Sequence, residues 1–111
     1  MPANFIKVDS IERLDELFKE SHKRPIVFFK HSLTCGISAG VKDIVSDIEA
    51  DLNVVVVQTE RHLSNEIAVR TSVRHQSPQA IVIKDGQAIY HASHYDITPD
   101  DIEQWIAAGH G

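Results

Sequence analysis

The pattern of apolar and polar positions divides the first thirty residues into a strand, a helix and a buried strand. Residues 4–8 alternate between apolar and polar side chains, which is typical of a strand with one face in a core. Asp9 and Glu12 have the spacing of a capping box, so a helix should follow and end near Pro25. The apolar face of that helix contains Ile11, Leu14, Leu17 and Phe18. The continuous apolar run at 26–29 then indicates a strand buried on both faces, at the centre of a sheet.

Helices and strands continue to alternate in the middle of the chain. Apolar residues recur at helical spacing directly after Cys35 and predict a long helix; they are Ile37, Val41, Ile44, Val45, Ile48 and Leu52. The β-branched run at 54–57 predicts another strand, and residues 64–71 predict a short helix. Strands separated by helices indicate parallel pairing.

The last third of the chain predicts a hairpin followed by a helix. The Asp-Gly pair at 85–86 separates two strand-like runs, 79–84 and 87–93, and such a pair is a strong hairpin signal. Thr98 and Pro99 are residue types of an N-cap and a first helical position. The buried face of this helix should contain Ile102, Trp105 and Ile106. The order β-α-β-α-β-α-β-β-α therefore predicts an α/β fold, a three-layer sandwich with a central mixed sheet and helices on both faces.

Length, composition and charge limit the possible functions. The 111 residues fit one domain, residues 1–111, which is long enough to bury a core without disulfide or metal staples. No apolar run approaches the ~20 residues needed to span a bilayer, and the first residues lack a secretory signal, so we expect a cytoplasmic protein with no membrane partner. The net charge of -5, without a stripe of Lys and Arg, argues against a nucleic-acid partner.

Cys35 is the only cysteine, and it lies between an apolar run and a helical pattern. A thiol at the first turn of a helix faces unpaired backbone N–H groups and the positive end of the helix dipole, and both favour the thiolate. A lone cysteine is commonly just a small buried apolar residue, but the strand-to-helix position favours a nucleophile here. Because one cysteine cannot form an internal disulfide, its disulfides must join it to another molecule.

This order of elements is similar to that of thioredoxin. In thioredoxin-like domains the redox cysteine begins the helix after the second strand, and a cis-proline precedes the closing strands. Cys35 and Pro78 occupy these two places. The resemblance therefore implies a cis Ser77–Pro78 bond, although most X–Pro bonds are trans. Such a bond would leave the backbone of Ser77 free to pair with an incoming peptide or peptide-like thiol.

Ser38 stands where the second cysteine of a C-x-x-C motif would be. A hydroxyl cannot attack the mixed disulfide that Cys35 forms, so the exchange must be monothiol and a second small-thiol molecule must release the adduct. Ser38 either donates a hydrogen bond to the Cys35 sulfur from one helical turn away or is an ordinary first-turn serine. Thr34 is expected to be the N-cap of the long helix.

Two segments, residues 34–38 (Thr-Cys-Gly-Ile-Ser) and 73–79 (Val-Arg-His-Gln-Ser-Pro-Gln), resemble the monothiol bacilliredoxins, thioredoxin-like proteins of bacteria that make bacillithiol. The resemblance covers essentially the whole chain. It implies removal of bacillithiol from S-bacillithiolated proteins, with this low-molecular-weight thiol as co-substrate and no bound cofactor. The catalytic residues would be Cys35 and Ser38, and the substrate-binding residues would be Thr34, Gly36, His75, Ser77 and Pro78. The family motif commonly reads T-C-P-I-S, so Gly36 is a departure that costs roughly 0.5–1 kcal/mol in chain entropy.

Several basic side chains are candidates for the same site. Lys30 and His31, in the segment leading to Cys35, either stabilise a thiolate or are solvent-exposed loop residues. His75 and Arg74 precede the Ser77–Pro78 pair and are candidates for approaching Cys35 and for binding the malate carboxylates of bacillithiol. Elsewhere, a zinc site at residues 91–95 is unconvincing because structural zinc usually needs four ligands, so a surface location is expected there.

Two other functions are compatible with the sequence. In the first, Cys35 holds an iron–sulfur cluster between two subunits, and small thiols complete the ligands, as in monothiol glutaredoxins. Such a cluster needs about four thiolates. Alternatively, the chain is a thioredoxin-like interaction module whose thiol is incidental, because fold alone does not establish function. A brown purified protein would indicate the first, and a slowly alkylated thiol the second.

Overall fold

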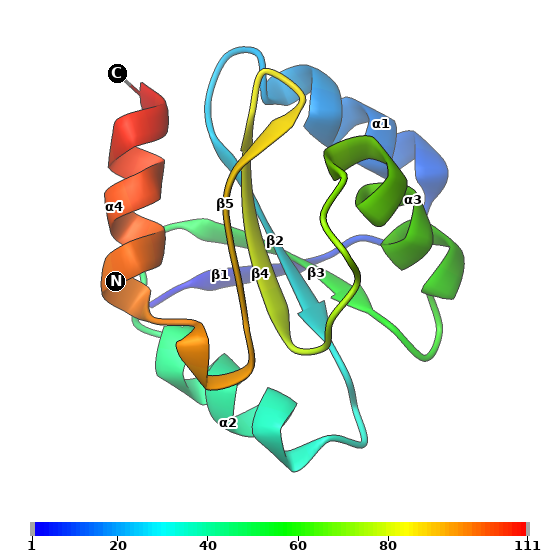
Figure 1. Ribbon diagram of the computed structural model, residues 1–111, viewed down its shortest axis with the longest axis vertical. Helices are drawn as coiled ribbons and strands as arrows, with labels where there is room; N and C mark the ends of the chain where they lie inside the picture. Colours follow the sequence, from blue (N-terminus) through cyan, green and yellow to red (C-terminus); the bar gives the residue numbers. More distant parts are fainter. Residues whose placement is uncertain (1, 111) are drawn as a thin grey trace.

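The computed structural model describes residues 2–110, and it confirms the predicted order of strands and helices (Figure 1). The strands are β1 (Asn4–Lys7), β2 (Ile26–His31), β3 (Asp51–Val56), β4 (Gln79–Lys84) and β5 (Gln87–Ser93). The helices are α1 (Ile11–Glu20), α2 (Gly36–Val45), α3 (Arg61–Thr71) and α4 (Pro99–His110), and a short 3-10 turn (His94–Asp96) precedes α4. Within the described residues, no helix combines the length and the apolar character that crossing a bilayer requires.

The five strands form one mixed sheet in the order β1-β3-β2-β4-β5. Strands β1, β3 and β2 run parallel, β4 pairs antiparallel with β2, and β5 pairs antiparallel with β4 to close the hairpin. The central position of β2 agrees with its unbroken burial. The predicted mixed sheet, with its second strand in the middle, is therefore confirmed.

Helices cover both faces of this sheet (Figure 1), and each pair of helices packs on its own apolar core. Successive side chains of β2 point to opposite faces, so Val27 and Phe29 join one core while Ile26 and Phe28 join the other. The core under α2 and α4 includes Val41, Val45, Ile48, Leu52, Val82 and Ile102. The core under α1 and α3 includes Leu14, Leu17, Val55, Leu63, Ile67 and Ile81. The predicted three-layer α/β sandwich is thus confirmed.

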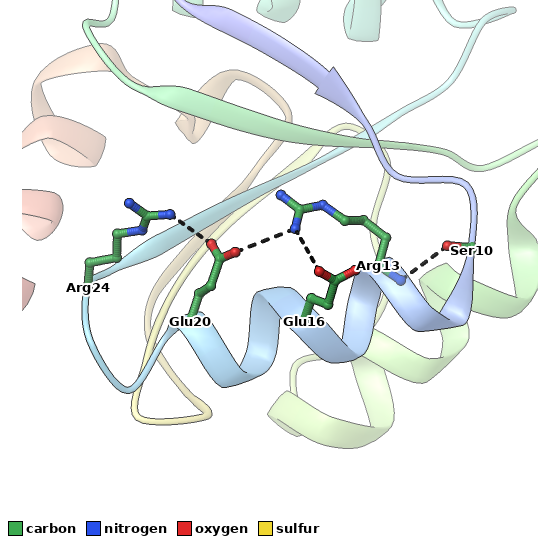
Figure 2. Close-up of polar contacts among 5 residues, drawn as sticks. All are labelled: Ser10, Arg13, Glu16, Glu20 and Arg24. Atoms are coloured by element: carbon green, nitrogen blue, oxygen red, sulfur yellow. Dashed lines mark hydrogen bonds and ion pairs between the residues drawn. The ribbon is translucent and has the colours of Figure 1, made fainter.

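Helix α1 begins one residue later than the capping pattern predicts. Ser10, not Asp9, has the extended backbone of an N-cap, and its hydroxyl accepts a hydrogen bond from the Arg13 N–H at 3.1 Å (Figure 2). Towards the other end of α1, Glu20 lies between two guanidinium groups, 2.9 Å from Arg24 and 3.5 Å from Arg13 (Figure 2). The hydrogen bond from Arg24, with help from Arg13, lowers the pKa of Glu20. These ion pairs lie where the chain enters β2, at the opposite end of that strand from Cys35.

Helix α2 is shorter than its apolar pattern predicts. It ends at Val45, and Ile48 and Leu52 lie beyond it, Leu52 already within β3. Both are nevertheless 1% exposed and belong to the same core as Val41 and Val45. The helical spacing continued past the helix because the turn and the next strand fill the same core. Strand β3 begins at Asp51 and helix α3 begins at Arg61, and each of these positions is three residues earlier than predicted.

Helix α4 confirms one predicted cap and corrects one predicted core residue. The Thr98 hydroxyl accepts a hydrogen bond from the Asp101 N–H at 3.2 Å, and the helix begins at Pro99 as expected. Trp105 is 38% exposed rather than buried. Its ring stacks on Tyr90 of the edge strand β5, with ring centroids 6.1 Å apart, so it covers the rim of the sheet instead of entering the core.

Candidate active site

The segment that leads to Cys35 and the segment that contains Pro78 leave the sheet side by side. In the register between β2 and β4, Lys30 lies opposite Gln79. The next antiparallel step places Pro78 beside His31, so the segment before β4 adjoins the segment that leads from β2 to α2 (Figure 1). The Ser77–Pro78 peptide bond is cis, as the resemblance to thioredoxin implied. The strand register thus places the segment that contains Pro78 next to the segment that leads to Cys35.

Cys35 is the N-cap of α2. Its backbone is extended, with φ -104° and ψ 118°, and its carbonyl accepts the N–H of Ala39 at 3.1 Å. No side chain caps the first turn of this helix, no acidic residue lies in that turn, and Cys35 is partly exposed. In the part of the chain that the structure describes, the Cys35 sulfur makes no capping hydrogen bond itself, so the geometry shows a thiol at a helix N-terminus whose first-turn N–H groups have no side-chain acceptor.

Thr34 is not the N-cap that the sequence predicted, because α2 begins one residue later than expected. Its hydroxyl instead accepts a hydrogen bond from the Gln58 side chain at 3.1 Å. The same amide nitrogen donates to Ser32 Oγ at 2.7 Å, and Gln58 Oε1 accepts the Leu33 N–H at 3.1 Å. The Gln58 side chain thus forms hydrogen bonds with three consecutive residues of the loop before Cys35. Sequence reasoning missed it, although a polar residue directly after a buried strand at the same sheet edge was the available signal.

Ser38 is fully buried and its hydroxyl is bound to the end of β2. It accepts the N–H of Ser32 at 3.0 Å and lies 2.7 Å from the Nδ1 atom of His31. Among residues 2–110, no hydrogen bond joins this hydroxyl to the Cys35 sulfur, and the suggested donation to sulfur stays a prediction. The contacts of Ser38 with His31 and Ser32 connect the first turn of α2 to the end of β2 and to the residue that follows it.

His31 is a strand residue, not the loop residue that the sequence suggested. Strand β2 continues two residues past the apolar run, because pairing with β3 extends to His31 and Val56. The ring is 8% exposed and stacks on Phe29, with ring centroids 5.8 Å apart. Burial, followed by the charge of Lys42, lowers the pKa of His31. A neutral ring therefore lies beneath the first turn of α2.

Lys30 is also a buried strand residue rather than an exposed loop residue. Its side chain lies on the face opposite to His31, because neighbouring strand residues point to opposite sides. It is 0% exposed, and Nζ donates to the Ser64 carbonyl at 3.0 Å and lies 3.3 Å from His75 Nδ1. Burial lowers the pKa of Lys30 from 10.5 to about 8. The ammonium form still predominates at pH 7.

His75 and Arg74 lie in the segment before the cis-proline, and both are exposed. His75 Nδ1 is 3.0 Å from the Ser64 hydroxyl, and burial, Lys30 and Arg61 together lower the pKa of the His75 ring. The Arg74 carbonyl accepts a hydrogen bond from the Gln79 side chain at 2.9 Å. The bonds of His75 thus reach α3 and β2, and its predicted approach to Cys35 remains a prediction.

Two exposed apolar side chains flank the cysteine. Leu33 is 65% exposed and Ile37 is 38% exposed, on either side of Cys35 in the chain. Away from this region, His91 and His94 are exposed, in the expected surface location. Within the part of the chain that the structure describes, no three His, Cys, Asp or Glu side chains gather in a way that could hold a metal ion.

Comparisons with known proteins agree with this geometry. Residues 6–102 match the family model described as Monothiol bacilliredoxin BrxC. A solved structure described as a candidate oxidoreductase with a thioredoxin fold is 34% identical, with 90% of this chain and 91% of that chain covered and a TM-score of 0.81. Thioredoxin NaTrxh from Nicotiana alata is 18% identical, with coverage of 98% and 95% and a TM-score of 0.73. A thioredoxin from Trypanosoma brucei brucei is 15% identical, with coverage of 95% and 89% and a TM-score of 0.74, and these two likenesses show the fold alone.

Proposed function

Because the chain belongs to the monothiol bacilliredoxin family, a family of thiol redox proteins, we propose that it removes bacillithiol from S-bacillithiolated proteins. The observation that carries this proposal is the position of Cys35 as the uncapped, partly exposed N-cap of α2. The absence of a second cysteine limits the chemistry to monothiol exchange. We place this activity in the cytoplasm, where a reducing thiol pool would supply the co-substrate.

The proposed reaction has two exchange steps. The Cys35 thiolate attacks the bacillithiol sulfur of the modified protein, the protein thiolate leaves, and a disulfide forms between Cys35 and bacillithiol. A second bacillithiol thiolate then attacks the bacillithiol sulfur of that adduct, and Cys35 leaves as a thiolate. The products are the restored protein thiol and the disulfide of two bacillithiol molecules, so atoms and electrons balance.

The residues around Cys35 would assist these steps in different ways. First-turn N–H groups of α2 stabilise the sulfur when it attacks and when it leaves. Ser38 holds the first turn against β2, and Gly36 allows close approach of the substrate. The substrate disulfide would lie between Thr34 and the Ser77–Pro78 segment, with the Ser77 backbone as a pairing edge.

The exposed apolar side chains beside Cys35 suit a protein substrate. Leu33 and Ile37 would contact the polypeptide around the modified cysteine, since apolar contacts are tolerant of the exact sequence. This arrangement favours a protein that accepts many different client proteins and recognises the small thiol attached to them.

The experiment is turnover of an S-bacillithiolated client protein with excess bacillithiol. Wild-type protein should restore the client thiol catalytically, and Cys35→Ser should not. Lys23→Met, in an exposed turn away from Cys35, serves as the folded control. Restoration at the uncatalysed rate by wild type, or equal restoration by Cys35→Ser, would contradict the proposal.

A further inference from the structure

Lys30 carries a buried charge that the proposed exchange reaction does not use. Its side chain is 0% exposed, and among residues 2–110 no carboxylate forms an ion pair with it. Burying a charge without an opposite charge is expensive, and such groups gather at functional sites. The hydrogen-bond partners of Lys30 are the Ser64 carbonyl, on α3, and His75, directly before the cis-proline loop. Lys30 therefore connects the central strand to the side of the site away from α2.

The contact between Lys30 and His75 determines which ring nitrogen of His75 carries the proton. An ammonium group only donates hydrogen bonds, so Nδ1 of His75, 3.3 Å from Nζ, must present its lone pair. The Ser64 hydroxyl, 3.0 Å from the same nitrogen, can donate to it as well. A neutral His75 ring then has its proton on Nε2, and a proton on Nδ1 would face the ammonium.

This arrangement directs an N–H group outwards. The two nitrogens of an imidazole ring point in widely different directions, so Nε2 is directed away when Nδ1 faces the interior. His75 is exposed and precedes the cis Ser77–Pro78 bond by two residues in the chain, and with Nδ1 occupied its Nε2–H is the ring group left for an outside partner. The ammonium of Lys30 lies behind the ring, and the guanidinium of Arg61, at the start of α3, is close enough to influence it. The charged groups that act on the His75 ring are thus both positive.

We propose that Lys30 and Ser64 are positioning residues that fix His75 as an outward Nε2–H donor, and that this donor binds a carboxylate of the small thiol. The inference rests on the proposed function and adds to it a means of recognising the thiol. A neutral imidazole backed by a buried ammonium offers a hydrogen bond and positive potential together, which suits a carboxylate better than a neutral group. An ammonium out of contact with solvent attracts the anion without forming an exposed ion pair.

The first test examines the tautomer of His75 in wild-type protein. Long-range 1H–15N spectra at pH 7 should show Nε2 protonated and Nδ1 unprotonated. In Lys30→Met, which keeps the side-chain volume, the ring should shift towards an average of both tautomers. A proton on Nδ1 in wild type, or tautomer signals that Lys30→Met leaves unchanged, would overturn the proposal.

The second test compares two modified forms of one client protein, one carrying bacillithiol and one carrying 2-mercaptoethanol, which has no carboxylate. Wild type should favour the bacillithiol form, and His75→Ala and Lys30→Met should each reduce this preference about tenfold, the value of one charge-assisted hydrogen bond. His62→Ala, on the exposed surface of α3, and Lys23→Met, in an exposed turn, are the matched controls and should keep the preference.

The outcomes of this second test separate the two proposals. Exchange of both client forms with a preference that His75→Ala and Lys30→Met leave unchanged overturns the inference and leaves the proposed function standing. Failure of wild type to process either form overturns the proposed function and the inference with it. Loss of preference in the two variants but not in the controls supports both.

Discussion

Lys30 and His31 are neighbours in the sequence, yet they support opposite sides of the site. His31 faces α2, where its ring contacts Ser38 beneath the first turn of the helix that Cys35 begins. Lys30 faces α3, where its ammonium contacts Ser64 and His75. Burial lowers the pKa of both groups, but His31 becomes neutral at pH 7 whereas Lys30, with a pKa of about 8, remains mostly charged. On the α2 face, neutral hydrogen bonds thus hold the first turn of the helix that Cys35 begins, and the α3 face retains a charge suited to binding.

The largest expected effect comes from converting the α2 face to a dithiol site. Ser38→Cys places a second thiol one helical turn from Cys35, where it can attack the mixed disulfide. The bacillithiol adduct should then be replaced by an internal disulfide, seen in intact mass as the loss of two hydrogen atoms. Ala107→Cys, which adds a thiol on an exposed part of α4, should retain the adduct on Cys35. A persistent adduct in Ser38→Cys would show that position 38 does not face the reacting sulfur.

The α3 face should gain stability when its buried charge is removed. Lys30→Met eliminates the cost of burying the ammonium and should raise the free energy of unfolding by about 1–3 kcal/mol at pH 7, as measured by urea denaturation. Lys23→Met removes a charge from an exposed turn and should change stability by less than about 0.5 kcal/mol. A less stable Lys30→Met protein would contradict this account of the α3 face.

The lowered pKa of Lys30 predicts that the stability difference between wild type and Lys30→Met depends on pH. Unfolded chains keep the lysine proton up to about pH 10.5, whereas the folded protein releases the Lys30 proton at about pH 8. Between these values the unfolded state binds more protons, so this group makes wild-type stability rise with pH. Lys30→Met should lack that rise, and its advantage over wild type should shrink between pH 7 and pH 9.5. An advantage independent of pH would contradict a depressed pKa for Lys30.

Removing the Ser38 hydroxyl on the α2 face should have the opposite effect on the free energy of unfolding. Ser38→Ala leaves the Ser32 N–H and the His31 ring without their shared partner and should lower the free energy of unfolding by about 1–3 kcal/mol. Ser46→Ala, at the other end of α2, is the control and should cost less. The His75 tautomer signals should stay unchanged in Ser38→Ala, because the two faces are supported separately. A shift in those signals would show that the faces are coupled.

The smallest effect concerns the glycine after the nucleophile. A side chain at Gly36 meets no atom within 4 Å, and the backbone of Cys35, φ -104° and ψ 118°, is a conformation that a following proline allows. Gly36→Pro should therefore raise the free energy of unfolding by about 0.5–1 kcal/mol through reduced freedom of the unfolded chain. Thermal denaturation measures this gain, and Gly40→Pro, within α2, should destabilise the protein instead. Destabilisation by Gly36→Pro would show that the N-terminus of α2 needs glycine.

Periodicity predicted the fold well because each helix has one face in a core and the central strand β2 has both of its faces in a core. It failed at the end of α2, where Ile48 and Leu52 fill the same core as the helix and so extend its pattern. It also misplaced Trp105, because an aromatic residue can cover the edge of a sheet as well as enter its core. Local spacing does not distinguish these cases.

The candidate site was predicted in part. Cys35 and Pro78 were found from their places in the order of elements, and the cis bond was confirmed. The sequence leaves Lys30 and His31 as possible loop residues, because polar side chains at the end of an apolar run do not distinguish a strand end from a loop. Their burial depends on partners far away in the chain, such as Ser64, 34 residues from Lys30.

The most direct test of the central claim is the intact mass of the protein after one exposure to an S-bacillithiolated client, without added thiol. The account predicts that wild type gains the mass of one bacillithiol, on Cys35, while the client loses it. Cys35→Ser should gain nothing. An unmodified wild-type chain beside a restored client, or an adduct on Cys35→Ser, would contradict exchange through a mixed disulfide on Cys35.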